Sequence, residues 1–382
     1  MIGLLTRWRQ RAATPATAPA STPTATPCQV RFADGRAPLA VAPGHTLLAG
    51  ALAAGLPWPH NCQVGTCGAC KTRVLQGRVQ PLMDFDLSPL TADELKTGHV
   101  LACQSRVRED LLVDVPMPTP GTAPGAAPAI VALGARIANA SQPAPDVMHL
   151  RLALDAPLHF HAGQYVHLTL DGHAPQRSYS LCEAPQPEGL GSVSFLIRRL
   201  PGGQFSELLF RHAAPGARMR LQGPYGTAAP LAADLPILGV AGGTGLAPML
   251  SLVADRLRAS AQARFTLLLG LRNQSDDFAT PLLAPLLHAH PGRVQVQIWL
   301  SDEPDGSAWA GPRGGVVDGI TAPLLQASGA AGAFLCGNAV MVNAARLRLL
   351  ALGLGASQIH ADAFAPSGEP AGEIPRCVSA AR

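Results

Sequence analysis

The feature that most constrains this chain is a group of cysteines, three of them in the stretch NCQVGTCGACK. Cys62, Cys67 and Cys70 are spaced C-x4-C-x2-C, and Cys103 follows in the segment LACQS. Four thiolates can hold two tetrahedral irons, because soft sulfur ligands suit iron–sulfur clusters. The four cysteines are therefore candidate ligands of one metal centre, and the stretch that carries three of them has to form a loop around it.

The spacing of the three close cysteines is the one found in plant-type [2Fe–2S] sites. Gly65 and Gly68 lie between them, and glycine permits the close approach and the positive φ values that such a loop needs. A four-cysteine zinc site and a disulfide pair are the alternatives. Zinc sites usually have two separate C-x2-C pairs, of which only one is present, and disulfides need an oxidising compartment, for which the sequence has no signal. We predict a [2Fe–2S] cluster held by the four cysteines.

Length and composition exclude several classes of protein. A chain of 382 residues is long enough for two to three domains of roughly 100–200 residues each. Only 14% of the residues are charged and the net charge is +4, so no nucleic-acid partner is expected. No run of about 18 apolar residues is present, so no stable membrane insertion is expected. The remaining cysteines, Cys28, Cys182, Cys336 and Cys377, are scattered, which favours a reducing cytoplasm.

Low-complexity segments divide the chain. The N-terminal tail is rich in Ala, Pro and Thr and is predicted to be disordered, and the segment PMPTPGTAPGAAPA is predicted to be a linker between domains. The expected divisions are a tail at 1–27, a cluster domain at 28–115, the linker at 116–129, a strand-rich domain at 130–230, a domain of alternating strands and helices at 231–366 and a second tail at 367–382.

The first domain begins with two apolar-alternating runs, CQVRFADG and APLAVAPG, which predict a hairpin. A helix is expected after Thr46, its predicted N-cap, and before Gly55, its predicted C-cap, and a second helix is expected to begin at Thr91. Strands are expected in KTRVLQGRV and in VREDLLVDV. This order, together with the cluster loop and the surroundings of Cys103, resembles the β-grasp fold of plant-type ferredoxins, which implies an α+β domain.

The second domain has the alternating pattern of short strands, in VMHLRLAL, QYVHLTL, SVSFLIRRL and ARMRLQG. Evenly spaced strands of this kind predict an antiparallel barrel. Four short motifs occur on it, AGQY ending at Tyr165, RSYS at 177–180, GGQFS at 202–206 and GPYG at 223–226. Each motif alone also fits an ordinary strand edge, turn or helix N-cap.

In this order the motifs resemble the FAD-binding barrel of the ferredoxin–NADP reductase superfamily. The resemblance implies that Arg177 binds the flavin pyrophosphate, that Tyr179 packs on the flavin and that Ser180 hydrogen-bonds near its reactive nitrogen, with Ser178 in the same strand. A guanidinium matches a phosphate, and an aromatic face suits a flat cofactor. The residues expected to bind phosphate at the N-terminus of the following helix are Gly202, Gly203 and Ser206.

The third domain alternates strands, PILGVA, RFTLLLGLR, VQVQIWLS and AAGAFLCGN, with helices, and this pattern indicates a doubly wound parallel sheet. The turn GGTGLAP departs from the G-x-G-x-x-G dinucleotide motif. Its small residues still allow the strand–helix turn to approach a pyrophosphate. Combined with GLR and CGN, the series resembles the NAD(P)-binding half of the same superfamily. The resemblance implies cofactor contacts from Gly243, Thr244, Gly245, Arg272, Cys336 and Gly337.

Cys336 is expected beside the nicotinamide, because ligands of such sheets bind at the C-terminal ends of the strands. The alternative is an ordinary buried cysteine. Ser180 and Cys336 are thus the candidate catalytic residues. Asp302 and Glu303 would repel a 2′-phosphate, which favours NADH, although NADPH stays possible because Arg272 could pair with that phosphate.

The order of the three domains resembles the reductase components of bacterial diiron monooxygenases and ring-hydroxylating dioxygenases. The resemblance implies hydride transfer from NADH to FAD, followed by single-electron transfer through the cluster to a terminal oxygenase or another acceptor protein. A reductase of a CDP-4-keto-6-deoxyhexose dehydrase and a redox-sensing or structural subunit are the alternatives. We expect a monomer, and we expect the acceptor to dock at Gln63, Val64 and Thr66 on the rim of the cluster loop.

Overall fold

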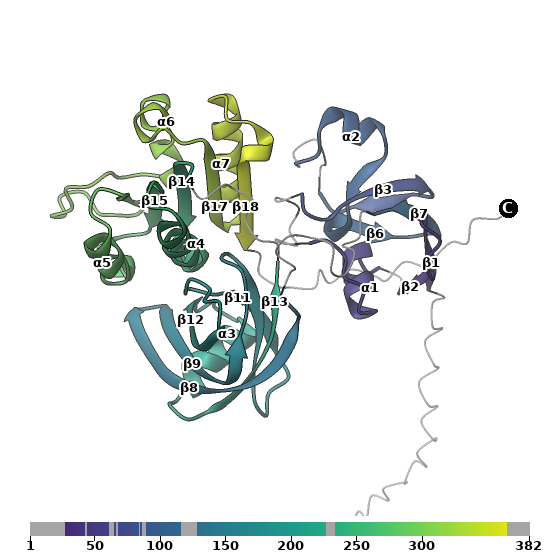
Figure 1. Cartoon of the computed structure of the whole chain (residues 1–382), viewed down its shortest axis with the longest axis horizontal. Helices are drawn as coiled ribbons and strands as arrows, with labels where there is room; N and C mark the ends of the chain where they lie inside the picture. Colours follow the sequence, from purple (N-terminus) through teal and green to yellow (C-terminus); the bar gives the residue numbers. More distant parts are fainter. Residues whose placement is uncertain are drawn as a thin grey trace, which may run out of the picture.

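The computed structural model describes residues 27–42, 44–60, 65, 68–83, 85, 89–115, 128–226 and 234–364. Within these residues the chain forms an N-terminal domain, a central barrel and a C-terminal sheet flanked by helices, in sequence order (Figure 1). No helix in this part of the chain is long and apolar enough to cross a membrane. Almost all of the two predicted tails and of the predicted linker lies outside the described residues.

The N-terminal domain is built on a mixed sheet. Its elements are β1 (Cys28–Phe32), β2 (Leu39–Val41), α1 (Leu47–Ala53), β3 (Lys71–Gln76), β4 (Val79–Pro81), α2 (Ala92–Lys96), β5 (His99–Leu101), β6 (Ser105–Val107) and β7 (Leu111–Asp114). Five strands form a sheet of order β2-β1-β7-β3-β5, in which β1 and β7 are parallel and the other pairs antiparallel, while β4 pairs with β6. Helix α1 contributes to a core of this domain's own residues. The predicted β-grasp arrangement is confirmed.

Local signals set the helix ends of this domain. The hydroxyl of Thr46 caps α1, and Thr91 forms a capping box with Glu94 at the start of α2, so both predicted helix starts are confirmed. The end of α1 differs by one residue from the expectation. Its C-cap is Ala54, and Gly55 follows with a φ of 73°, a conformation that glycine adopts without strain.

The central domain is an antiparallel barrel. Its elements are β8 (Val131–Ala144), β9 (Val147–Leu158), β10 (Tyr165–Leu170), β11 (Gln176–Ser180), β12 (Leu190–Arg198), α3 (Gln204–His212) and β13 (Arg218–Tyr225). The strands have the order β11-β10-β13-β8-β9-β12, and the edge strands β11 and β12 approach each other, so the sheet curls on itself. Inward side chains such as Val166 and Phe195 fill its interior together with Phe205 of α3. The predicted barrel is confirmed.

The C-terminal domain is a parallel sheet covered by helices on both faces. Its elements are β14 (Ile237–Gly242), α4 (Leu246–Ala259), β15 (Phe265–Leu271), α5 (Ala279–Ala289), β16 (Val294–Leu300), α6 (Ala322–Ser328), β17 (Gly332–Asn338), α7 (Ala339–Ala351) and β18 (Ile359–Phe364). The order β16-β15-β14-β17-β18 places the reversal of strand order between β14 and β17. Helices α4 and α5 pack on one face, and α6 and α7 on the other. The predicted doubly wound sheet is confirmed.

The barrel and the C-terminal sheet share one hydrophobic core. Val147 and Leu196 of the barrel belong to the same buried cluster as Leu252 of α4. The hydroxyl of Ser251 donates to the backbone oxygen of Glu183 at 2.6 Å across the same boundary. Figure 1 shows the barrel directly below α4 in the view drawn. These two domains therefore form one packed unit.

Four charged side chains cross the boundary between barrel and sheet. Arg198 at the end of β12 donates to Asp146 at 2.7 Å and to Asp276 at 3.1 Å, and Arg272 donates to the same carboxylates at 2.9 and 3.1 Å. The side chain of Asp276 is only 2% exposed. Burial raises the pKa of Asp276, but the hydrogen bonds from Arg272 and Arg198 outweigh this effect and hold it below its usual value. We call these four residues the charge network.

Replacing Asp276 by Ala should lower the free energy of unfolding by about 3 kcal/mol, as expected when one partner of a buried ion pair is removed. Two guanidinium groups would then lose a shared buried acceptor. A urea titration followed by circular dichroism measures the change. The matched control is Asp255→Ala, which breaks a more exposed pair with Arg258 and should cost less than about 1 kcal/mol. Equal losses in the two variants would contradict the prediction.

Candidate cofactor sites

Two of the four predicted cluster ligands can be placed. Cys70 precedes β3 and Cys103 lies in a short 3-10 turn after β5, and their sulfur atoms are 3.3 Å apart. Both are buried and neither is in a disulfide, and the backbone nitrogen of Ala102 donates to the backbone oxygen of Cys70 at 3.1 Å. Two sulfur atoms held this close without a disulfide suit ligation of a common metal centre. Cys62, Cys67 and the predicted docking rim lie outside the described residues.

The glycines of the cluster loop have the conformation expected of them. Gly65 and Gly68 have φ values of 84° and 74°, which other residues rarely adopt. A Cβ atom on Gly65 would also overlap the side chains of Met83 and Gln104. Gly65 therefore packs closely on the side chains of Met83 and Gln104, and a larger residue would not fit there.

The RSYS motif forms strand β11, and its side chains alternate between two faces. Tyr179 packs on Phe205 of α3 at 5.9 Å between ring centroids, and burial raises the pKa of its hydroxyl. On the other face the Ser178 hydroxyl lies 3.0 Å from Nδ1 of His167, and Ser180 is buried opposite Tyr165. The strand thus offers a half-buried aromatic side and a hydroxyl side, which fits a flat cofactor with polar ring atoms.

The predicted phosphate-binding turn lies beside that strand. Helix α3 has Gly203 as its N-cap, and Gly202 before it has a φ of 74°. The hydroxyl of Ser206 accepts a hydrogen bond from the backbone nitrogen of Leu200 at 3.1 Å, so it closes the turn. Arg177 and Tyr179 are two residues apart in β11 and therefore lie on the same face of the strand. The unpaired N–H groups at this helix start fit a pyrophosphate, and the roles of Arg177, Gly202, Gly203 and Ser206 stay predictions.

The structure brings the two predicted nucleotide motifs together at the point where strand order reverses. Gly243, Thr244 and Gly245 form a 3-10 turn between β14 and α4. A Cβ atom on Gly245 would lie 2.4 Å from the backbone oxygen of Cys336, so only glycine fits. Gly337, next to Cys336, has a φ of 144°. Such a close, side-chain-free junction at the strand ends suits a dinucleotide.

Cys336 is completely buried at the end of β17, with Ala241 and Asp362 as its strand neighbours. Burial raises the pKa of its thiol well above the usual value, and the charge of Asp362 adds to this effect. The thiol is therefore protonated at neutral pH and does not act as a thiolate nucleophile. Its place beside a nicotinamide stays a prediction.

Arg272, expected as a phosphate partner, is engaged in the charge network. Hydrogen bonding to Asp276 raises the pKa of its guanidinium. The acidic segment lies next to it, since the backbone nitrogen of Asp302 donates to the backbone oxygen of Arg272 at 2.7 Å. The carboxylate of Glu303 accepts from the backbone nitrogen of Gln274 at 2.8 Å. The guanidinium of Arg272 is thus paired with two carboxylates, and the acidic segment follows beside its backbone.

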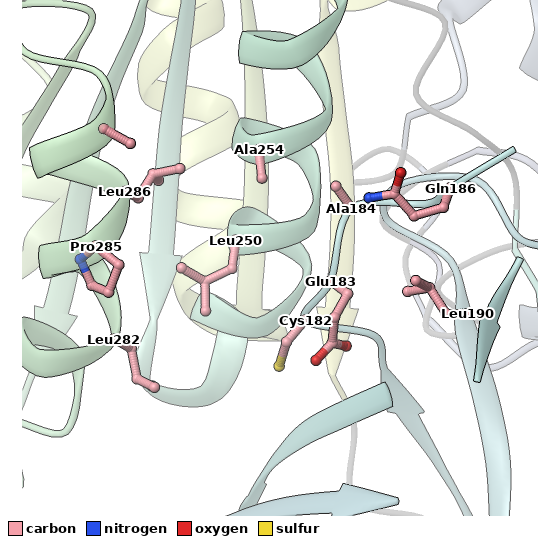
Figure 2. Close-up of a pocket in the computed structure, with 11 residues that line it drawn as sticks. Cys182, Glu183, Ala184, Gln186, Leu190, Leu250, Ala254, Leu282, Pro285 and Leu286 are labelled. Atoms are coloured by element: carbon pink, nitrogen blue, oxygen red, sulfur yellow. The ribbon is translucent and has the colours of Figure 1, made fainter. Parts of the chain in front are cut away.

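A cavity that no sequence pattern predicts lies between the barrel and the sheet. It has a volume of about 480 Å³ and lies between the segment 182–190, α4 and α5. Figure 2 shows Leu250 of α4 and Leu286 of α5 facing it from one side and Gln186 from the other. Glu183 at its edge accepts from the backbone nitrogen of Ser194 at 2.8 Å, and burial raises the pKa of Glu183. No motif marked this cavity, because its lining comes from three distant segments.

A second unanticipated feature is a group of four rings next to the cluster loop. Tyr165 stacks on Tyr225 at 5.8 Å, His167 lies 4.3 Å from Tyr225, and His60 lies 6.5 Å from Tyr225. A signal was available, because two of the chain's three tyrosines end or occupy the motifs AGQY and GPYG. We call these four residues the ring contact.

Three family models match the chain. The 2Fe-2S iron-sulfur cluster binding domain matches residues 32–108, the oxidoreductase FAD-binding domain matches residues 135–229, and the oxidoreductase NAD-binding domain matches residues 240–347. These three matches confirm the predicted cofactors, a [2Fe–2S] cluster, FAD and a nicotinamide nucleotide. The segments fall on the N-terminal domain, the barrel and the parallel sheet, respectively.

Relatives match nearly the whole chain. The electron transfer component of xylene/toluene monooxygenase of Pseudomonas putida is 33% identical and covers 84% of this chain and 89% of its own length. The ferredoxin–NAD(P)(+) reductase component of the naphthalene 1,2-dioxygenase/salicylate 5-hydroxylase systems of Ralstonia sp is 33% identical over 85% and 95%. The crystal structure of an Amycolatopsis cytochrome P450 reductase is 30% identical over 89% and 100%, with a TM-score of 0.65.

The fold and its sites define an iron–sulfur flavoprotein oxidoreductase. The chain belongs to the family of ferredoxin–NAD(P) reductase-type electron-transfer proteins that carry an N-terminal [2Fe–2S] domain. It is therefore an NAD(P)H-dependent enzyme, as the sequence predicted.

The pH dependence of stability should report on His167. Burial, together with the charge of His60, lowers the pKa of this histidine from its usual 6.5 to about 4. Because the unfolded chain takes up the proton first as the pH falls, His167 should cost about 2 kcal/mol of stability between pH 7.5 and pH 5.

Urea titrations at both pH values should show this loss in the wild type, and His167→Phe should abolish that part of the pH dependence while keeping a ring in place. A variant with the wild-type pH dependence would rule out the assignment.

Proposed function

We propose that this chain oxidises NADH and passes the electrons, one at a time, to a terminal oxygenase component. When bound, FAD accepts a hydride and the [2Fe–2S] cluster carries single electrons, so the two convert a two-electron donor into a one-electron source. The proposal is supported by the presence of all three cofactor-binding domains on one chain. The relatives that match more than four fifths of its length are electron-transfer components of oxygenase systems.

The residues fit these tasks as follows. The buried pair Cys70 and Cys103 would supply two of the cluster's four thiolates, with Cys62 and Cys67 as the others. On the barrel, Arg177 and the amides after Gly202 and Gly203 would bind the FAD pyrophosphate. Tyr179 would pack on the flavin ring, and the hydroxyls of Ser178 and Ser180 would meet its polar atoms. These assignments are proposals supported by the placement of β11 beside the start of α3.

The nucleotide would bind where β14 and β17 end. The turn of Gly243, Thr244 and Gly245 leaves room for the pyrophosphate, and Cys336 with Gly337 would border the nicotinamide. Because the Cys336 thiol is protonated, it would contribute a small uncharged surface beside the nicotinamide and would not act as a base.

We infer a preference for NADH from the acidic segment beside Arg272. Asp302 and Glu303 follow β16, and the guanidinium of Arg272 is occupied by Asp146 and Asp276. A 2′-phosphate placed beside this segment would be repelled by the carboxylates of Asp302 and Glu303, because like charges repel. NADPH is therefore disfavoured.

We also propose that the chain acts as a monomer in the cytoplasm. Among the five described cysteines, Cys182 and Cys336 are free thiols, which supports a reducing compartment. Cys28 departs from that expectation, because it is disulfide-bonded. Fractionation of cells that produce the chain, with size-exclusion chromatography of the soluble fraction, tests both statements.

The electron route is tested with the variant Cys103→Ala. This variant should retain FAD and reduce ferricyanide with NADH, but it should lose the iron absorbance and the reduction of cytochrome c. Cys182→Ala, a buried cysteine outside the predicted ligand set, is the matched control and should keep its iron.

Wild-type protein that contains FAD and iron but reduces neither acceptor would overturn the reductase function in favour of a sensor or structural subunit. FAD with stoichiometric zinc would overturn the cluster. Purified oxygenase and dehydrase components, offered as acceptors, distinguish the two candidate partners.

Nucleotide preference is tested by replacing one carboxylate. Asp302→Ser should raise kcat/KM for NADPH by about tenfold, since removing one nearby like charge is worth about 1.4 kcal/mol, and should leave kcat/KM for NADH within about twofold. Asp305→Ser, which removes an exposed carboxylate from the same segment, is the control. An unchanged NADPH constant in Asp302→Ser would show that this carboxylate does not face the ribose.

A further inference from the structure

The ring contact joins the N-terminal domain to the barrel, and His60 is its member from the N-terminal domain. His60 is two residues before the predicted ligand Cys62 in the sequence. Its Nδ1 atom lies 2.7 Å from the backbone oxygen of Trp58, and Trp58 is 1% exposed and packs on Phe32 in the domain's core. The imidazole is thus anchored to the core at the point where the chain enters the cluster loop.

The barrel side of the ring contact is part of the strand framework. Tyr165 and Tyr225 are register partners in β10 and β13, and their rings stack with an interplanar angle of 27°. His167 lies two residues after Tyr165 on the same face, 4.3 Å from the ring of Tyr225. Its Nδ1 atom is 3.0 Å from the hydroxyl of Ser178 in the RSYS strand. A continuous line of contacts therefore runs from the predicted flavin strand to His60.

The orientation of the N-terminal domain relative to the barrel depends on surface contacts such as the ring contact. Its buried core consists of residues between Cys28 and Val115 alone, whereas the barrel and the parallel sheet share a core. Surface contacts therefore set the distance between the cluster loop and the flavin strand. Electron transfer slows steeply as that distance grows, so a contact that orients the N-terminal domain on the barrel affects its rate.

We propose that His60 is a positioning residue, which holds the N-terminal domain against the barrel by packing on Tyr225. The proposal rests on the proposed function, in which one electron leaves the bound flavin and reduces one iron of the bound cluster, with no bond formed or broken. The imidazole acts through ring packing. A phenylalanine at position 60 should therefore replace it, and an alanine should not.

The experiment compares His60→Ala, His60→Phe and wild type, each loaded with FAD and iron. After mixing with NADH, stopped-flow absorbance separates flavin reduction from cluster reduction. Flavin reduction and ferricyanide turnover should be unchanged in all three. Cluster reduction should slow by at least about tenfold in His60→Ala, as expected when reacting groups are misplaced, and should return to within about twofold of wild type in His60→Phe.

Hydrogen exchange provides the structural readout and does not depend on turnover. In His60→Ala, amides of the segments 56–60 and 222–226 should exchange faster than in wild type, and His60→Phe should restore their protection. His45→Ala, which removes an exposed histidine of the same domain, is the matched control and should change neither measurement.

Tyr225→Leu removes the ring on the barrel side of the same contact. In protein with full FAD content, this variant should reproduce the slow cluster reduction of His60→Ala. Wild-type cluster reduction in His60→Ala, or slow reduction with unchanged exchange in both segments, would overturn the proposal. Failure of the wild-type cluster to accept electrons from the reduced flavin would instead overturn the proposed function.

Discussion

Two guanidinium groups and two carboxylates hold the barrel against the parallel sheet, and the alignment of the predicted flavin and nucleotide sites depends on them. Arg198 ends a barrel strand and Arg272 follows a sheet strand, yet both bind Asp146 and Asp276. The buried carboxylate of Asp276 accepts from an arginine of each domain. A tilt of either domain would break one of these ion pairs at a site that is almost inaccessible to water. Together with the shared core, the network therefore constrains the angle at which nicotinamide and flavin would meet.

The electrons would cross two kinds of domain boundary. The barrel and the parallel sheet share a core and form a rigid half, whereas the N-terminal domain has its own core and is oriented by surface contacts. Within the rigid half, the turn at Gly245 touches the backbone of Cys336 so closely that the two nucleotide motifs behave as one surface. The cluster-bearing domain has its own core and meets the barrel through side chains such as His60 and Tyr225. Hydride transfer thus depends on packing shared by two domains, whereas the last intramolecular step depends on a surface contact.

The sequence predicted the three folds correctly, because each leaves a periodic or spaced pattern within one short segment. The cysteine array, the alternation along 147–223 and the glycine turn at Gly243 are patterns of this kind. The charge network was not predictable in the same way, since Arg272 and Asp146 are 126 residues apart. From sequence alone, an arginine that follows a strand is predicted to bind phosphate. The carboxylates that pair with Arg272 become visible only in the fold. His60 was missed for the same reason, because its partner Tyr225 lies in another domain.

The separate core of the N-terminal domain has a consequence for damage. Iron–sulfur loops are the chemically fragile part of such a protein, since their thiolates oxidise readily once the metal is lost. Here the buried side chains around Cys70 and Cys103 come from residues 28–115, and the barrel with its sheet keeps a complete core of its own. Collapse of the cluster domain therefore leaves the flavin half folded. The flavin half of a damaged molecule would still accept a hydride from NADH, but the electrons could no longer pass through the cluster.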